Sequence, residues 1–398
     1  MTSLDFAAFD ADNHYYEALD AFTRHLEKGF ASRTMQWAEV GGKTRLLVGG
    51  KVNRFIPNPT FDPVSKPGAL DEYFRGRNPK SAGIIDLFGE LDPIDPAYRD
   101  RDARLARMDQ QGLQGAFFFP TLAVGMEQPL IGDPEALMAA FRAFNRWVEE
   151  DWGFAYQERI FAAPYIPLVD VDNAVAELEW ALERDVRVII IGVGPVITAS
   201  GGRAPSDPMY DPFWARVNEA GVTLALHGGD SAYGRYLEHW GQGAEMEAFR
   251  ANPLRSLLSH DPIHDTVAAM LADQFFFRFP NIRVASIELG SAWAFHLFEK
   301  LEKTFGQAPF AFQEDPRETF RRHVWVSPYY EDDLRGLRDL VGVDHILMGS
   351  DWPHAEGLAE PTSFIDDLHR EGYDDADARL IMRDNGLALS RTRSLARA

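Results

Sequence analysis

Short apolar runs recur along the chain at intervals typical of buried β-strands. Eight of them stand out, several nearly continuous in Val, Ile, Leu, Phe and Ala, and they cover residues 4–11, 115–120, 160–167, 186–193, 222–228, 282–290, 323–329 and 344–351. Strands that are buried on both faces of a parallel sheet have this uninterrupted apolar character. The pattern therefore predicts eight strands in a mainly parallel sheet.

Amphipathic helical patterns lie between these runs. In 171–185 the apolar positions follow helical spacing, with acids early and Arg184 late, as the helix dipole prefers. Three further segments, 211–221, 263–280 and 292–306, show the same character. Strands that alternate with helices build βαβ units, and eight such units predict an α/β fold of the (β/α)₈ TIM-barrel type. The alternative is an open doubly wound sheet, whose dinucleotide-binding form is disfavoured because no Gly-x-Gly-x-x-Gly follows the first run.

Two connections between the predicted strands are much longer than the others. The first, at about 20–110, contains a stretch typical of a β-hairpin at 34–55, turning at Gly41-Gly42, and a Pro-rich loop at 58–68. The second covers about 229–262. No repeat or change of composition marks a domain boundary, so we predict a single domain over 1–398 with two insertions. Both are expected to shape the active-site face.

Composition narrows the classes of partner and site. The formal net charge of -21 disfavours nucleic acid and anionic membranes as partners, although acidity can also simply keep a protein soluble. The chain has no cysteine, so any metal site must use His, Asp and Glu. The first residues lack a signal-peptide pattern, and no apolar run reaches the ~18 residues of a bilayer span. We therefore expect a cytoplasmic protein that acts on a small molecule.

Polar side chains that can bind metal stand at the carboxyl ends of several predicted strands. Barrel enzymes place their chemistry at this face, so side chains from different strands can converge there. Asp12 and His14 are two residues apart and would point the same way on a strand. The set consists of Asp10, Asp12 and His14 in the first strand region, His227 in the fifth, Glu288 in the sixth and Asp351 in the eighth.

Each of these residues also has a structural interpretation. His14 or His227 alone could be an ordinary loop histidine, and Asp12 or Asp351 could cap a helix. Together, however, two histidines and two carboxylates at the same face are the donor set that a divalent cation needs, with a position left for water or substrate. The combination favours a metal site over four independent structural roles.

The chain resembles the amidohydrolase superfamily, in particular the branch with aminocarboxymuconate-semialdehyde decarboxylase and γ-resorcylate decarboxylase. The resemblance extends from DADNH (10–14) through LHGG (226–229) and RFPNIRVASIELGSAW (278–293) to MGSDWPH (348–354) and MRDNGLAL (382–389). It implies the barrel fold, a homodimer and one divalent metal ion, usually zinc or manganese. The ligands that it implies are Asp12, His14, His227 and Asp351, the last also a possible proton acceptor.

Two positions refine the metal prediction. The fourth strand ends in IIIGVGP without the lysine of two-metal branches, which favours a single metal. Many relatives have a histidine where this chain has Glu288, so Glu288 is expected to act as a catalytic base or acid, or as a further oxygen ligand. Alternatively, Glu288 pairs with an arginine and has no chemical role. Two carboxylates on the cation favour harder ions such as Mn²⁺ or Mg²⁺.

Residues expected around this core are candidates for substrate binding. They are His264, early in the helix before the sixth strand, and Trp293, Trp352 and His354, and for each a structural role is an equal alternative. Arg235 and Arg255, in the second long connection, could bind a substrate carboxylate, although most surface arginines have no such role.

The sequence leaves the reaction open between three classes. A metal-dependent hydrolase of a small ester, lactone or amide would use a metal-activated water, with Asp351 or Glu288 moving the proton. A metal-dependent decarboxylase of an aromatic or enoic acid is the alternative. It needs a proton donor at the reacting carbon, and Glu288, ionised near a cation, is a poor donor. The sequence therefore favours hydrolysis. A binding protein that has lost catalysis is the third class, and the complete ligand set argues against it.

Overall fold

The computed structural model describes residues 4–78, 81–243, 245–258, 261–329 and 332–393. Its central strands are parallel and form two sheets. The first contains β1 (Ala8–Tyr15), β5 (Leu113–Pro120) and β6 (Ile160–Ala162). The second contains, in spatial order, β7 (Val188–Ile191), β10 (Thr223–His227), β11 (Arg283–Ile287) and β12 (Val324–Val326). Within each sheet the spatial order follows the chain, which is the arrangement that successive βαβ units produce.

Backbone hydrogen bonds connect the two sheets at both edges. Beyond β6, Ile166 N donates to Ile190 O of β7 at 2.9 Å. On the other side, Leu347 N donates to Val326 O of β12 at 2.9 Å, and Ala11 N of β1 donates to Met348 O at 2.8 Å. The segment around 346–352 therefore lies between β12 and β1. The α/β character that the sequence predicts is confirmed.

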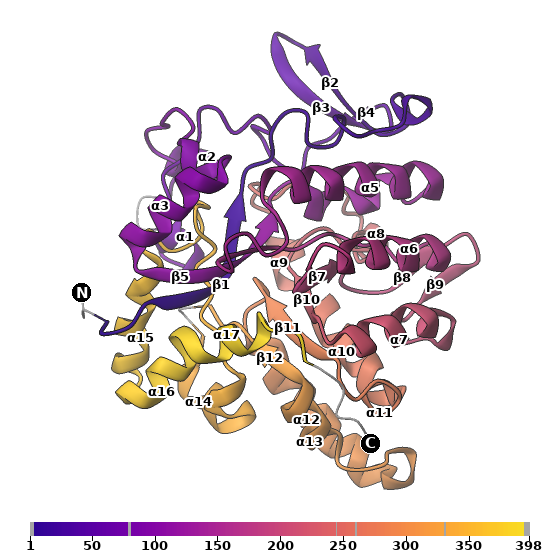
Figure 1. Cartoon of the computed structure of the whole chain (residues 1–398), viewed down its shortest axis with the longest axis vertical. Helices are drawn as coiled ribbons and strands as arrows, with labels where there is room; N and C mark the ends of the chain where they lie inside the picture. The colour runs from indigo at the N-terminus through magenta and orange to yellow at the C-terminus, as the bar shows by residue number, and fades with distance from the viewer. Residues whose placement is uncertain (1–3, 79–80, 244, 259–260, 330–331, 394–398) are drawn as a thin grey trace.

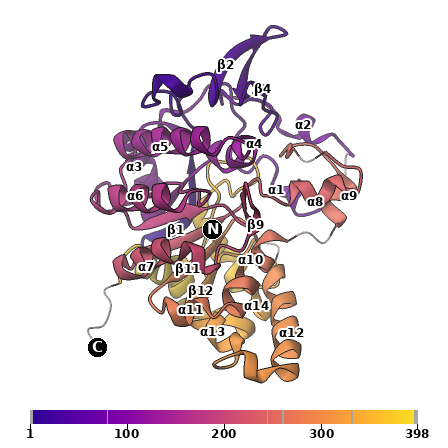
Figure 2. The same ribbon diagram turned by 90° about the vertical axis from the view of Figure 1, so that its right-hand side faces the viewer.

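Helices surround the strands (Figures 1 and 2). Six of the longer ones begin after an aspartate whose carboxylate accepts a hydrogen bond from a backbone N–H of the first turn, so part of the acid surplus of the chain caps helices. The helices of eight or more residues are α3 (Arg101–Gln111), α5 (Pro134–Asp151), α6 (Val171–Leu182), α7 (Asp211–Ala220), α10 (Pro262–Ala272), α12 (Ala292–Gln307), α13 (Pro316–His323) and α14 (Leu334–Val341). The shorter ones are α1 (Asp71–Phe74), α2 (Ile84–Leu87), α4 (Glu127–Leu130), α8 (Gly234–Glu238), α9 (Pro253–Leu257), α11 (Phe275–Arg278), α15 (Phe364–Arg370), α16 (Asp375–Arg379) and α17 (Asn385–Leu389).

Several predicted boundaries need correction. The expected helix at 263–280 is two helices, α10 and α11, because the backbone of Gln274 turns to φ 53° between them. The first strand is Ala8–Tyr15 rather than 4–11, so Asp12 and His14 lie within it.

The predicted eighth strand, 344–351, forms only isolated bridges, Val326↔Ile346 and Asn13↔Trp352. A side chain interrupts the regular ladder here, because the Asp10 carboxylate accepts a hydrogen bond from Ser350 N at 3.0 Å. The backbone of Asp351 then turns to φ 55°, outside the extended region.

The two long connections lie over the same end of the strands. The first contains the expected hairpin, with β2 (Met35–Val40) antiparallel to β3 (Lys43–Val48), and β4 (Lys51–Val52) beside it. This hairpin projects at the top of Figure 1. The second long connection contacts the first, because Ala248 N donates to Phe55 O at 3.0 Å and the rings of Phe88 and Phe249 are 5.0 Å apart. A small hairpin of β8 (Val196–Thr198) and β9 (Gly201–Arg203) follows β7.

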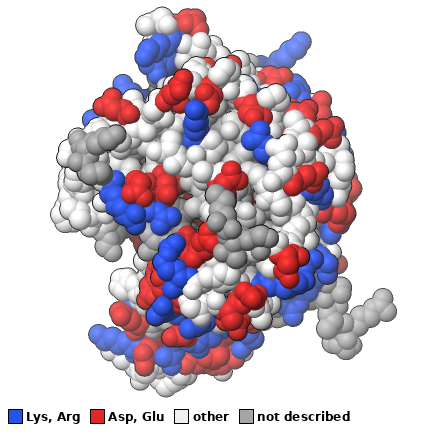
Figure 3. All heavy atoms as spheres, turned by 90° about the vertical axis from the view of Figure 1, so that its left-hand side faces the viewer, with Lys and Arg blue, Asp and Glu red and all other residues white. Residues whose placement is uncertain are grey.

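Acidic and basic side chains are interspersed on the face of the molecule that Figure 3 shows. Among the described residues, none of the helices combines the length and apolar character that a bilayer span requires.

Asn385 holds the irregular segment before Asp351 in place. Its buried side-chain amide donates to Val343 O at 2.9 Å and to Ile346 O at 2.7 Å. An Asn385→Ala substitution leaves the buried carbonyl of Ile346 and the partly buried carbonyl of Val343 without this partner, and we expect it to lower the free energy of unfolding by about 1–3 kcal/mol. Urea unfolding measures the change. The exposed Gln307→Ala variant is the control, and equal stability of the two variants would contradict this role for Asn385.

Candidate metal centre and active site

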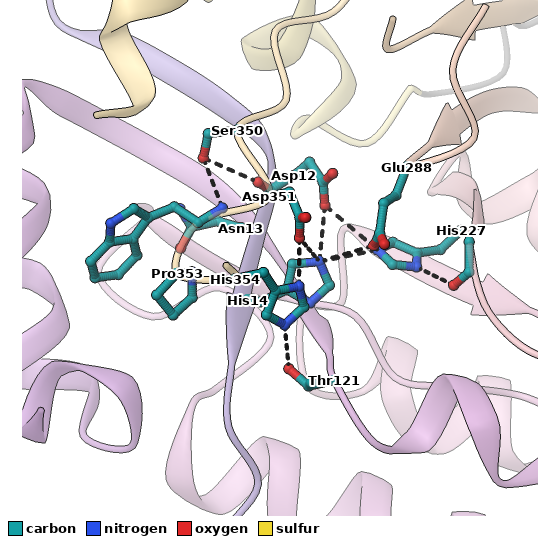
Figure 4. A network of polar contacts seen from close by, with 12 residues as sticks. Asp12, Asn13, His14, Thr121, His227, Glu288, Ser350, Asp351, Pro353 and His354 are labelled. Atoms are coloured by element: carbon teal, nitrogen blue, oxygen red, sulfur yellow. Dashed lines mark hydrogen bonds and ion pairs between the residues drawn. The ribbon is translucent and has the colours of Figure 1, made fainter. Parts of the chain in front are cut away.

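Five potential metal-binding side chains converge at the carboxyl ends of the parallel strands (Figure 4). Asp12 and His14 come from β1, and His227 is the last residue of β10. Glu288 follows β11 directly, and Asp351 lies in the segment between β12 and β1. As expected from strand geometry, Asp12 and His14 point the same way, with Asp12 Oδ1 3.2 Å from His14 Nε2. Long-range folding therefore brings together residues that are hundreds of positions apart.

The ligand atoms lie close around a common point. His14 Nε2 and His227 Nε2 are 3.3 Å apart, and Glu288 Oε2 is 3.4 Å from the first and 3.1 Å from the second. One donor atom from each of Asp12, His14, His227 and Glu288 lies within 4.8 Å of all the others. The first three residues are buried, and Glu288 is partly buried. These four residues form the candidate metal site.

The site fits a divalent cation better than it fits any arrangement of hydrogen bonds. Asp12 Oδ1 is buried and has no hydrogen-bond partner among the described residues. His227 Nδ1 is 2.7 Å from Gly228 O, a contact that requires a proton on Nδ1 and leaves the Nε2 lone pair facing the other ligands. Two imidazole nitrogens and two carboxylate oxygens that face one another at these distances are the donor set of a metal centre.

The charges of the site support the same conclusion. Burial lowers the pKa of His14, but its contacts with Asp12 and Glu288 outweigh burial and raise that pKa to about 10. Burial raises the pKa of Asp12, yet contacts with His14 and His227 hold it below its usual range. The buried carboxylates thus need positive charge, which protonated His14 supplies in the protein alone. A bound cation would supply that charge and release the His14 proton.

The backbone is strained at two residues of the site. Glu288 has φ 54° and Asp351 has φ 55°, in the left-handed region that residues other than glycine seldom adopt. Such strain costs about 1–3 kcal/mol per residue and is retained where the surrounding structure requires it. Here it turns both side chains from the strand ends toward the ligand cluster.

Asp351 is closer to His354 than to the ligand cluster. Its Oδ1 lies 2.6 Å from His354 Nδ1 and 3.4 Å from His14 Nε2. The other ring nitrogen of His354, Nε2, is 2.8 Å from Thr121 Oγ1, which itself donates to Tyr15 O at 2.8 Å. Burial and the carboxylate of Glu288 raise the pKa of Asp351, and burial and the neighbouring His14 lower the pKa of His354. The two groups therefore form a buried pair beside the candidate metal site.

A layer of buried residues holds β1 behind the site. The Asp10 carboxylate accepts from Asn13 Nδ2 at 2.8 Å and from Ser350 N at 3.0 Å, which ties β1 to the Asp351 segment. The buried Arg104 of α3 donates to His14 O at 2.7 Å and to Asn13. These contacts fix the backbone from which Asp12 and His14 project.

A cavity of about 620 Å³ opens from this cluster to the surface. Asp12, His14, Glu288, Asp351 and His354 line one end of it. Both long connections supply side chains to the walls, as expected from the sequence, Phe55 to Leu91 from the first and Met246 to Phe249 from the second.

Comparison with known proteins identifies the family. The sequence profile of the amidohydrolase family matches residues 52–389. The chain belongs to the amidohydrolase family. An amidohydrolase from Mycobacterium avium subsp. paratuberculosis K-10 has a similar solved structure, with a TM-score of 0.91 and 44% identity over 98% of this chain and 100% of that one.

Among curated proteins, γ-resorcylate decarboxylase from Rhodococcus jostii (strain RHA1) is 24% identical over 304 residues, 73% of this chain and 87% of the relative. A dihydroxybenzoic acid decarboxylase from Polaromonas sp. JS666, solved with manganese and 2-nitroresorcinol, has a TM-score of 0.58 at 16% identity, over 81% of this chain and 93% of that one. The resemblance to the amidohydrolase superfamily and its decarboxylase-containing branch is thereby confirmed.

Three of the four predicted substrate-binding residues of this family member lie outside the cavity lining. His264 Nδ1 contacts Asp265 Oδ1 at 2.8 Å, and Trp293 Nε1 donates to Gly290 O at 3.0 Å. Trp352 packs under Arg104, whose guanidinium carbon is 4.6 Å from the indole ring centroid. These three side chains are buried and make contacts within the protein, so substrate contact stays a prediction that the cavity lining does not support. His354 does line the cavity, and Arg235 and Arg255 do not.

Sequence reasoning missed two residues that support the site. Thr121, the partner of His354, directly follows the second apolar run, so a search for hydroxyls as well as charges at the strand ends would have found it. Arg104 lies within a helix in a charged stretch, and the sequence carries no signal of its burial.

Proposed function

We propose that this amidohydrolase-family protein is a metal-dependent, non-oxidative decarboxylase of an aromatic or enoic carboxylic acid. The observation that carries the proposal is the buried Asp351–His354 pair beside the candidate metal ligands. Decarboxylation requires a proton at the carbon that loses the carboxylate, and this pair can supply it. The decarboxylases among the relatives support the same reaction class.

The hydrogen-bond order indicates that the pair holds a proton. Thr121 uses its single O–H toward Tyr15 O, so it accepts from His354, whose Nε2 must be protonated. Nδ1 and Asp351 Oδ1 are 2.6 Å apart without the angle of a regular hydrogen bond, and two bare lone pairs at this distance would repel one another. We therefore propose that one of the two atoms carries a proton. Burial raises the pKa of Asp351 and lowers the pKa of His354, and both directions support a proton on the carboxyl group of the pair.

Each residue then has a defined task. A cation held by Asp12, His14, His227 and Glu288 would bind the substrate carboxylate and draw negative charge toward itself. The proton between Asp351 and His354 passes to the carbon bearing the carboxylate. The bond from that carbon to the carboxylate then breaks, and its electron pair restores the π-system as carbon dioxide leaves. Thr121 holds the imidazole ring in position throughout.

Hydrolysis of an ester, lactone or amide is the competing function that the sequence favoured. That preference rested on Glu288 as a poor proton donor. We now propose Glu288 as a metal ligand, because its Oε2 faces both histidines, and Asp351 as the proton carrier more than as a ligand. The objection to decarboxylation is thereby removed.

The remaining features of the proposal come from the sequence. We propose a single (β/α)₈ barrel over 1–398, in which the 346–352 segment takes the eighth position and the segments at about 20–110 and 229–262 are insertions. The metal is one ion of Mn²⁺, Zn²⁺ or Mg²⁺, and the manganese in a relative agrees with the carboxylate-rich donor set. A cytoplasmic homodimer that acts on a small molecule, and binds neither nucleic acid nor membranes, remains a prediction.

A substrate panel tests the reaction class. We expect the metal-loaded protein to release carbon dioxide from at least one member of a panel of hydroxybenzoates and carboxymuconate analogues. In ²H₂O, the product should carry deuterium at the carbon that bore the carboxylate. Turnover of lactones or esters, with no carbon dioxide released from any acid of the panel, would instead support the hydrolase function.

A further inference from the structure

The cavity of about 620 Å³ has a polar end and long apolar walls. Its polar end consists of the ligand cluster together with the Asp351–His354 pair. Away from this end the walls are aromatic and aliphatic, with Phe55, Phe61, Val64, Phe88, Met246 and Phe249 among them. A cavity of this volume is in the range that encloses a drug-sized molecule, which is larger than a single substituted ring.

The mouth of the cavity is apolar as well. Phe74, Ile85 and Leu91 line it and are 43%, 55% and 46% exposed. Large apolar side chains grouped at a solvent-exposed opening are typical of a surface that receives an apolar ligand. The apolar surface therefore continues from the mouth toward the ligand cluster.

Charge limits where a carboxylate can lie. Among the described lining residues, Lys43 is the one lysine or arginine, and it is exposed at the turn of the β2–β3 hairpin. A carboxylate within the walls would lose water without gaining a cationic partner, which is costly. The candidate metal is the one buried place along this cavity where a carboxylate would find its counter-charge.

We infer that the substrate has one carboxylate head and, behind it, an apolar body larger than a single ring, of the bulk of two fused rings or more. This inference rests on the proposed function, because the head is the carboxylate that the metal would bind. It goes beyond that function by separating this protein's substrate from the single-ring dihydroxybenzoates that the names of its relatives mention.

Binding of a matched pair of acids tests the inference. Salicylate and 3-hydroxy-2-naphthoate share the same carboxylate and neighbouring hydroxyl, and the second adds one fused ring on the side away from them. Calorimetric titration of the metal-loaded protein should give a dissociation constant at least about tenfold lower for the naphthoate, equivalent to ~1.4 kcal/mol. A gain of less than about tenfold would overturn the inference.

A variant tests whether the preference for the naphthoate over salicylate arises at the cavity wall. Ala248 lines the cavity outside the ligand cluster, and Ala248→Phe should fill the space that the second ring needs and abolish the naphthoate preference. The matched control is Ala311→Phe, at an exposed alanine outside the lining, which should keep the preference. A folded Ala248→Phe protein with an unchanged preference would also overturn the inference. Even if Ala248→Phe does not fold, the two dissociation constants measured with the wild-type protein test the inference.

The two proposals fail in different ways. If salicylate binds and the fused ring adds no affinity, the inference about the body fails and the decarboxylase proposal stands. If neither acid binds to protein that contains its metal, the inference about the body fails, and carbon dioxide release from the substrate panel decides separately whether the decarboxylase proposal stands.

Discussion

A His14→Ala variant is expected to retain less than about one tenth of the divalent metal that the wild-type protein binds. His14 Nε2 is the atom nearest the centre of the cluster, within 3.2–3.4 Å of ligand atoms from Asp12, His227, Glu288 and Asp351. Its removal leaves buried carboxylates without a nitrogen ligand to complete the site. Even groups that only orient a ligand change metal affinity by about 10–100-fold, so loss of a direct ligand should exceed that range.

Elemental analysis after dialysis against the metal measures this loss. His239→Ala is the matched control, because it removes an exposed histidine that is not among the candidate ligands, and it should keep the wild-type metal content. Full metal occupancy in His14→Ala, or in Asp12→Ala, would show that the ligands have been assigned incorrectly.

The same measurement separates the roles of two carboxylates. Glu288→Gln should lose metal, because Glu288 Oε2 faces both histidines. Asp351→Asn should lose far less, because Asp351 Oδ1 is nearer to His354 than to His14. The reverse ranking would make Asp351 the ligand and Glu288 the proton-handling residue.

A His354→Gln variant should keep its metal and lower kcat/KM for decarboxylation by about 10²–10⁴-fold. Glutamine can still bond Thr121, but it cannot take up and release a proton at neutral pH. Removal of this residue from the pair leaves Asp351 without the group that shares its proton. The loss of rate should therefore arise in the chemical step, while binding of metal and substrate is kept.

Initial rates on the best acid of the panel, with metal content measured in parallel, test this prediction. The control is His264→Gln, a buried histidine outside the cavity lining, which should change the rate by less than about threefold unless it impairs folding. A His354→Gln protein with full metal and a wild-type rate would remove His354 from proton transfer and leave the Asp351 carboxyl to act alone.

The metal-binding half of the site could be read from the sequence because it obeys local rules. Side chains two apart on a strand share a face, so Asp12 and His14 had to point together. Ligand-type residues at the ends of other apolar runs had to meet them, because parallel strands bring their carboxyl ends to one edge. His227 and Glu288 were found by this rule, although the sequence left Glu288 between a base and a ligand.

The positions of the side chains around the site could not be predicted from the sequence in the same way. Trp293 and Trp352 lie within the motifs and His264 lies early in the helix before the sixth strand, but all three are buried outside the cavity lining. Adjacency along the chain does not fix the direction of a side chain once the backbone leaves regular geometry. The φ values of Glu288 and Asp351 are such departures, and the sequence carries no signal of them.

The sequence by itself determined the alternation of strands and helices, the ligand types and the absence of thiolate chemistry, because hydrophobic period and residue identity are local properties. The tertiary structure alone decided that Asp351 pairs with His354 and Thr121, that Arg104 is buried against β1, and that two distant connections enclose one apolar cavity. Each of these depends on packing between segments far apart in the chain. DADNHYYE (10–17) carries candidate ligands that the sequence could name, and folding alone brings Thr121 and the ends of the other strands to them.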